Sequence, residues 1–288
     1  MYKRSWVVFT DFYSRFCNTK LVFPVSSSCL ALFISYLCAK GLAPATINSY
    51  LSAIAYVHKL KGLADPTKTF LIEKLRVAIG RRSKADIRLP ISRPLLYKLA
   101  NALTHTNPSA YQRCLYTCIF MVAFYGFFRI GELACKQISQ RDQVVRFENV
   151  TFLMQGNAIQ SVKIVITRFK HNTDNRPFTI IIDRQPAEQY CPVQCLINYL
   201  KLRGYSQGPL FALANGDPIT VTQFNRQLQL ALSFCGLDSS RYKSHSFRIG
   251  AACYAAEKGL SDAQIRTLGR WNSDAFKIYI RPPALTSN

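Results

Sequence analysis

The stretch KSHSFRIGAACYAA, residues 243–256, combines a core-like helical pattern with two side chains that are foreign to a core. Its Cys, Ala, Tyr and Ile positions suit a helix packed in an interior. His245 and Arg248 are three residues apart, so both lie on one face of that helix. An arginine at the edge of a core is costly unless an anion meets it. The stretch therefore predicts a helix that presents both side chains to a bound anion.

The net charge indicates the kind of anion. The 288 residues include 37 Lys and Arg against 15 Asp and Glu, a formal charge of +22. Nearly half of the residues are apolar, which is typical of a globular chain rather than a disordered basic tail. Residues 1–85 carry +10 of the charge and the remainder carries +12. A basic excess can be only a solvated surface, but two basic halves favour a protein that clamps nucleic acid.

Cysteine spacing and hydropathy argue against other classes. The ten cysteines form no CxxC pair and the four histidines no HxxxH. We therefore expect free, mostly buried thiols in a reducing compartment, and no metal site. The first residues, MYKRSWVVFTDF, lack the apolar segment of a secretory signal, and the apolar run at 114–128 is too short to span a bilayer. We expect a soluble intracellular protein with no membrane partner.

The first third of the chain reads as a small helical bundle. Amphipathic segments with short loops between them predict four helices, at residues 4–17, 26–41, 45–62 and 67–80. We assign residues 1–83 to this domain. The basic segment RRSKADIRLPISR, residues 81–93, has little to anchor it, and we interpret residues 84–93 as a linker that follows a phosphate backbone. A solvated charged loop is the alternative.

The remaining residues, 94–288, mix both kinds of pattern. The helical segments are expected at 94–105, 109–135, 192–202, 224–236, 244–259 and 261–271, and the strand-like runs at 144–154, 158–169 and 177–183. The fold class predicted for this domain is therefore mostly α with a small antiparallel β-sheet, an α+β domain.

Polar side chains interrupt core-like patterns at three places in this second domain. Arg129 and Glu132 follow a deeply apolar run at i, i+3 spacing, which alone could be a structural ion pair. The second place is the opening stretch. At the third, Trp271 precedes Tyr279 by eight residues.

Together these residue types suggest phosphoryl transfer. Guanidinium groups bind non-bridging phosphate oxygens, and a tyrosine hydroxyl can be the nucleophile that forms a covalent phosphodiester. The sequence has neither a GxxxxGKS loop nor an evident acidic metal cluster. We therefore expect transesterification of a phosphodiester without metal, ATP or another cofactor.

These residues resemble the signature of the tyrosine recombinases, the phage-integrase family. The ordered signature comprises RIGE at 129–132, HSFR at 245–248, GRW at 269–271 and Tyr279. Further segments are most similar to recombinases of DIRS- and Ngaro-type retrotransposons: FYGFFRIGELA, RLPIS, YCPVQCLINYL, GPLF, HSFRIGAA, GLSDAQI, LGRW and YIRPP. The resemblance covers nearly the whole chain. It implies a four-helix SAM-like core-binding domain, a catalytic domain, double-stranded DNA as partner, a homotetramer on two DNA sites and nuclear localisation.

The resemblance also implies residue roles. Arg129 and Arg248 would grip the scissile phosphate, and His245 would act in proton transfer. Trp271 would donate its indole N–H to a phosphate oxygen. Tyr279 would attack phosphorus and form a 3′-phosphotyrosine, so that DNA strands are cleaved and rejoined, and a mobile element integrated.

Two further roles concern support and the general acid. Glu132 would hold Arg129 or His245 in place. Lys170, in VITRFKHNTDNRPFTII, would protonate the leaving oxygen, with Lys163 as a second candidate. The family pattern there is a compact S-K-T-D, whereas Phe169 replaces the small polar residue here and two residues are inserted.

Two other functions stay open on the sequence. A type IB topoisomerase-like relaxing enzyme shares the chemistry but acts as a monomer on one duplex. A DNA-binding derivative that has lost catalysis would fit a chain whose opening MYKRSW resembles the middle of a first core-binding helix, and in which nine residues follow Tyr279. The DNA target sequence is not readable, because it depends on base-edge contacts and DNA deformability.

Overall fold

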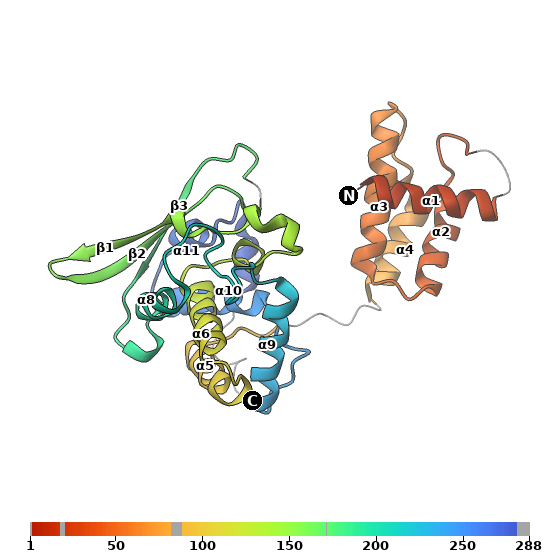
Figure 1. Ribbon diagram of the computed structural model, residues 1–288. Helices are drawn as coiled ribbons and strands as arrows, with labels where there is room; N and C mark the ends of the chain where they lie inside the picture. Colours follow the sequence, from red (N-terminus) through yellow and green to blue (C-terminus); the bar gives the residue numbers. More distant parts are fainter. Residues whose placement is uncertain (1, 18–20, 82–87, 171, 281–288) are drawn as a thin grey trace. The chain divides into compact units, whose positions relative to one another are not determined.

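A computed structural model describes residues 2–17, 21–81, 88–170 and 172–280. The chain divides into two compact units, Met1–Asp86 and Ile87–Asn288, each with its own hydrophobic core (Figure 1). Residues 84–87 of the predicted linker lie outside the described residues. Among the described helices, none has both the length and the apolar character needed to cross a membrane.

The first unit is helical throughout its regular structure. Its elements are α1 (Tyr2–Phe16), α2 (Ser27–Ala39), α3 (Pro44–Leu60), the 3₁₀ turn η1 (Pro66–Lys68) and α4 (Phe70–Arg81). The Ser26 side chain caps α2 by accepting from Cys29 N, and Pro44 occupies the first turn of α3, where its missing N–H costs nothing. Phe9, Phe12 and Phe33 fill the centre of the bundle. The four helices coincide with the four predicted segments to within a few residues.

The second unit contains the small antiparallel sheet that the sequence predicted. Strands β1 (Val150–Gln155), β2 (Ala158–Ile166) and β3 (Phe178–Asp183) lie in the order β1-β2-β3. Val162 pairs with Ile182 and Ile164 with Ile180, and these four side chains are buried on one face. The fold class predicted from the sequence is confirmed.

The predicted strand 144–154 is wrong in its first six residues. There the backbone pairs with other segments instead of the sheet: Val145 N donates to Glu132 O at 2.8 Å, and Leu210 N donates to Val145 O at 2.9 Å. The 3₁₀ turn η3 (Phe147–Asn149) then leads into β1. Contacts with loops far away in the sequence therefore decide where β1 begins.

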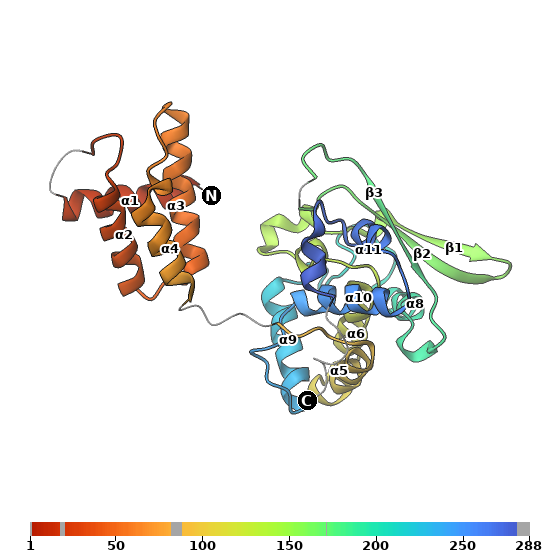
Figure 2. The ribbon, with the colours of Figure 1, turned by 180° about the vertical axis from the view of Figure 1, so that it is seen from behind.

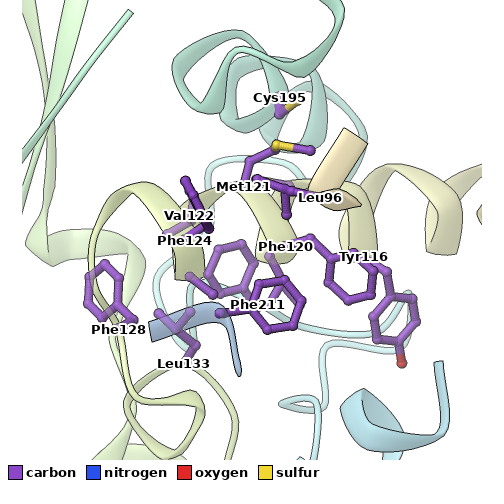
Figure 3. Packing of buried hydrophobic residues seen from close by; sticks show 14 of the residues in the cluster. Leu96, Tyr116, Phe120, Met121, Val122, Phe124, Phe128, Leu133, Cys195 and Phe211 are labelled. Carbon is purple, nitrogen blue, oxygen red and sulfur yellow. The ribbon is translucent and has the colours of Figure 1, made fainter. Parts of the chain in front are cut away.

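Helices form most of the remaining regular structure of the second unit. They are α5 (Arg93–Thr106), α6 (Ala110–Tyr125), α7 (Ile130–Leu133), α8 (Pro192–Arg203), α9 (Val221–Phe234), α10 (His245–Glu257) and α11 (Asp262–Gly269), with the 3₁₀ turns η2 (Ile138–Gln143), η4 (Glu188–Tyr190) and η5 (Asp274–Ile278). Helix α6 is the central element, because it packs against α5, α8 and α10 (Figure 2). Its Phe120 and Met121 are fully buried, and Met121 reaches toward Cys195 of α8 (Figure 3).

The predicted helix 109–135 is two helices. Helix α6 ends at Tyr125, Gly126 is its C-cap, and Phe127 adopts a positive φ of 52°. A Cβ at Gly126 would overlap the ring of Phe128, so the close approach of that ring requires glycine. The chain therefore turns before Arg129, which becomes the N-cap residue of α7 instead of continuing α6.

The described end of the predicted linker is anchored, which corrects the expectation of a segment with little to hold it. Leu89 N donates to Arg241 O at 2.9 Å, and Ile91 N donates to Ser246 O at 3.0 Å. Ile91 is fully buried. A Cβ at Gly250 would overlap the Ile91 carbonyl, so the glycine of HSFRIG lets the segment around Ile91 lie against α10.

Candidate active site

Three segments that are far apart in the sequence bring five of the predicted site residues together. Arg129 and Glu132 come from the start of α7, His245 and Arg248 from the first turn of α10, and Tyr279 from the turn after η5. His245 Nε2 lies 3.1 Å from the Tyr279 hydroxyl, and the Arg248 guanidinium lies 4.3 Å from the Trp271 ring centre.

Glu132 is the buried carboxylate of this site. Its side chain is 6% exposed, Oε2 accepts from Arg129 N at 2.9 Å, and Oε1 accepts from Arg129 Nη1 at 3.3 Å. The carboxylate thus caps α7 and orients the Arg129 guanidinium at once. The sequence predicted Arg129 and Glu132 as an i, i+3 pair on one continuous helix, whereas in the structure they form the N-terminal cap of the separate helix α7.

Arg248 is buried but only partly satisfied by the protein. It is 1% exposed, Nη1 donates to Phe127 O at 2.6 Å, and Nη2 donates to Gly269 O. Among the described residues, its Nε has no hydrogen-bond partner. Burial, and then the charge of Arg129, lower the pKa of Arg248 to about 9, so the group stays charged at neutral pH. A buried cation with an unpaired Nε is a site that an anion would stabilise.

His245 is held as a neutral ring. Burial is the first cause that lowers its pKa to about 4, followed by the positive charges of Arg248, Arg88, Arg129 and Lys170. At pH 7 the ring is therefore neutral, and in the tautomer that carries its proton on Nδ1 the Nε2 atom faces the Tyr279 hydroxyl and can accept its proton.

The backbone of Tyr279 is fixed by two hydrogen bonds. Tyr279 N donates to Phe276 O at 2.8 Å, and the Cys253 thiol donates to Tyr279 O at 2.9 Å. Both partners belong to the second unit, in which Phe276 is fully buried. The hydroxyl is therefore presented to His245 by a well-anchored turn.

Trp271 packs against this cluster through its ring. The indole lies over the Arg248 guanidinium and 6.1 Å from the Tyr279 ring centre. A Cβ at Gly269 would overlap the indole, so the packing of the Trp271 ring explains why a glycine stands two residues before it. The indole contributes a cation–π contact to Arg248.

The two candidate lysines lie in different settings. Lys163 is in the middle of β2, between Thr151 of β1 and Ile181 of β3. Lys170 is exposed in the turn after β2, and its charge is one of those that lower the pKa of His245. Lys170 is thus near enough for its charge to act on the His245 ring.

Arg270 is a further residue of this cluster that is not among the residues predicted from the sequence. This residue has a positive φ of 53° and is 5% exposed, and its Nη2 donates to Glu132 Oε2 at 2.7 Å and to Phe127 O at 3.2 Å. Burial, the first cause, lowers its pKa. The sequence did carry a signal for Arg270. It stands between a glycine and a tryptophan in a core-like motif, and Glu132 follows an apolar run as a possible buried partner.

The chemistry of the cluster is that of an anion site beside a nucleophile. Arg129 and Arg248 supply positive charge, and Tyr279 and His245 form a hydroxyl–base pair. Within the described ranges, no three His, Cys, Asp or Glu side chains gather as metal ligands would. The ten cysteines are in the thiol form.

Comparisons with known proteins identify the fold. Neither the models of protein families nor the curated proteins give a match. Among solved structures, the XerH site-specific recombinase bound to a palindromic difH substrate is 16% identical with a TM-score of 0.66, covering 96% of this chain and 73% of that one. The Tn1549 transposon integrase in complex with transposon right end DNA is 15% identical (TM-score 0.62, 97% and 88% covered). A lambda integrase (75–356) dimer bound to a COC′ core site is 14% identical, with a TM-score of 0.61 and coverage of 99% of this chain and 91% of that one. The chain has the fold of the tyrosine recombinase catalytic domain.

Proposed function

We propose that this protein is a site-specific DNA recombinase that cleaves and rejoins DNA strands through a covalent 3′-phosphotyrosine on Tyr279. The observation that carries the proposal is the 3.1 Å contact between the Tyr279 hydroxyl and the neutral His245 ring, beside the buried Arg248. A phenol poised against a base next to an unsatisfied cation is the arrangement that attack on a phosphodiester requires.

The proposed reaction balances without an external energy source. The Tyr279 oxygen attacks phosphorus, its proton passes to His245, and the bond from phosphorus to the 5′ oxygen breaks. Lys170 gives a proton to that oxygen as it leaves. Arg129 and Arg248 hold the two non-bridging oxygens. Attack of a 5′-hydroxyl on the phosphotyrosine then reforms the DNA bond and releases Tyr279.

Several features support double-stranded DNA as the partner. The net charge of +22 is spread over both halves of the chain. Solved structures of the same fold include a lambda integrase dimer on a core site and a tetramer on a Holliday junction. We infer that residues 1–83 form a core-binding domain, that residues 94–288 carry catalysis, and that four protomers act on two sites in the nucleus to integrate a mobile element of the DIRS or Ngaro type.

The test is covalent capture of DNA. The full chain is incubated with a library of nicked duplexes, denatured with detergent, and the DNA that remains attached is sequenced. Wild type is expected to retain DNA of a defined sequence, and Tyr279→Phe is expected to retain none while its duplex binding is unchanged. Adducts without sequence preference, with relaxation of supercoiled DNA by the monomer, would instead identify a topoisomerase-like enzyme. Duplex binding without adducts would identify a derivative that has lost catalysis.

A further inference from the structure

Arg270 lies where three aromatic rings and one carboxylate converge. Its guanidinium carbon is 5.4 Å from the Phe128 ring centre, 5.8 Å from that of Phe169 and 5.6 Å from that of Phe178. Its Nη2 contacts Glu132 Oε2 at 2.7 Å. Such ring faces attract a cation, more strongly when both are removed from water.

Two of the residues that Arg270 contacts stand next to proposed catalytic residues in the sequence. Phe128 precedes Arg129, and Phe169 precedes Lys170. One buried guanidinium therefore contacts both the turn that leads to a phosphate-gripping arginine and the turn that carries the general acid.

The contact also explains a departure of the sequence. The tyrosine recombinases that this sequence resembles have a small polar residue where this chain has Phe169. A small side chain there would leave the Arg270 guanidinium with two neighbouring rings instead of three. Phe169 supplies the third ring, and its ring centre lies 6.0 Å from that of Phe178. The unusual phenylalanine and the buried arginine thus belong to one structural unit.

Arg270 is a poor candidate for a purely stabilising residue. Its Nε and Nη1 are buried and, within the residues that the structure describes, have no hydrogen-bond partner. An apolar side chain of similar length would avoid that desolvation cost. A buried arginine that is incompletely paired is more easily explained by what it positions than by what it stabilises.

We propose that Arg270, acting with Phe169, is a positioning residue that aligns the Lys170 turn with the proposed phosphate-binding arginines. The inference rests on the proposed function. Lys170 must deliver a proton to the 5′ oxygen as its bond to phosphorus breaks, and this transfer is sensitive to displacements of the acid by about 1 Å. Loss of the Phe169–Arg270 contact would impair that proton transfer selectively, because Glu132 still orients Arg129.

The experiment compares two leaving groups. Phe169→Leu is tested on an ordinary phosphodiester and on a strand whose bridging 5′ oxygen is replaced by sulfur, which departs as a thiolate and needs no proton. Cleavage of the ordinary strand is expected to slow by about 10- to 100-fold. Cleavage of the sulfur strand is expected to stay within about threefold of wild type, as for Lys170→Ala, in which the acid itself is missing.

Matched variants separate positioning from general damage. Phe152→Leu removes a partly buried ring from β1 of the same sheet and should affect neither substrate, and Phe169→Tyr, which keeps a ring face for the cation, should retain wild-type rates. Arg270→Met should repeat the Phe169→Leu pattern. If Arg270→Met does not fold, Phe169→Leu decides alone.

Two outcomes would count against the proposals, and they are distinguishable. If the wild type forms adducts but Phe169→Leu slows both substrates equally, Arg270 and Phe169 do not position the acid and this inference is wrong. If the wild type forms no Tyr279 adduct with either strand, the proposed function itself fails.

Discussion

Removal of the charge of Glu132 should destabilise the second unit far more than removal of a surface carboxylate. Glu132 is the buried acid between Arg129 and Arg270, with side-chain exposures of 6% for the acid and 2% for Arg270. Breaking a buried pair by removing one partner costs about 3–5 kcal/mol, because it leaves an uncompensated charge. Glu132→Gln retains one acceptor oxygen, so we expect the lower end, about 3 kcal/mol.

The matched control is Asp142→Asn. Asp142 pairs with Arg146 at 2.6 Å in the same unit, but its side chain is 72% exposed. Exposed pairs contribute less than about 1 kcal/mol, and both variants raise the net charge by one. For a unit of this size, a loss of 3 kcal/mol corresponds to a fall in Tm of about 6–12 °C, against at most a few degrees for the control.

Thermal unfolding followed by tryptophan fluorescence measures the difference. The chain has two tryptophans, Trp6 in α1 and Trp271 in the site. A Trp6→Phe background therefore makes the signal report on the second unit alone. Adding Arg270→Met to Glu132→Gln removes the uncompensated cation and should recover part of the lost stability. Equal melting temperatures for Glu132→Gln and Asp142→Asn would refute the reasoning.

Four further results are expected. Burial and neighbouring cations lower the pKa of His245 to about 4, whereas in the unfolded chain its pKa is near the ordinary value of 6.5. The free energy of unfolding should therefore fall as the pH drops from 6.5 to 4, because the unfolded chain binds the proton first. In acid titrations, His245→Asn should lose this part of the pH dependence. DNA cleavage should stay level at neutral pH and decline only toward about pH 4, as the base becomes protonated. In single-turnover assays, a bridging 5′ sulfur should restore the cleavage rate of Lys170→Ala but should not raise that of Lys163→Ala. The reverse pattern would identify Lys163 as the general acid. Gly269→Ala should displace the Trp271 ring, seen as a shift in its fluorescence, and lower cleavage at least about tenfold, since its Cβ would overlap the indole.

Much of the architecture could be predicted from local patterns. Periodic apolar residues determine which segments become helices and strands, because burial of one face is the main force that holds each element in place. The four helices of the first unit and the mostly helical second unit with its small antiparallel sheet follow from that rule. The residue types of HSFR, RIGE and Tyr279 likewise indicated an anion site, because charged groups in core-like segments need a partner.

Only the tertiary structure decided how the elements end and what meets at the site. The helix that the pattern extended to residue 135 stops at Tyr125, because the ring of Phe128 packs against Gly126 and turns the chain. Arg270 was overlooked because its carboxylate partner lies 138 residues away, at Glu132. Periodicity reports which face of a segment is buried, but it carries no information about which distant side chain shares the burial. Pairing across such distances is set by packing in three dimensions, where the cost of an unpaired buried charge selects the partners.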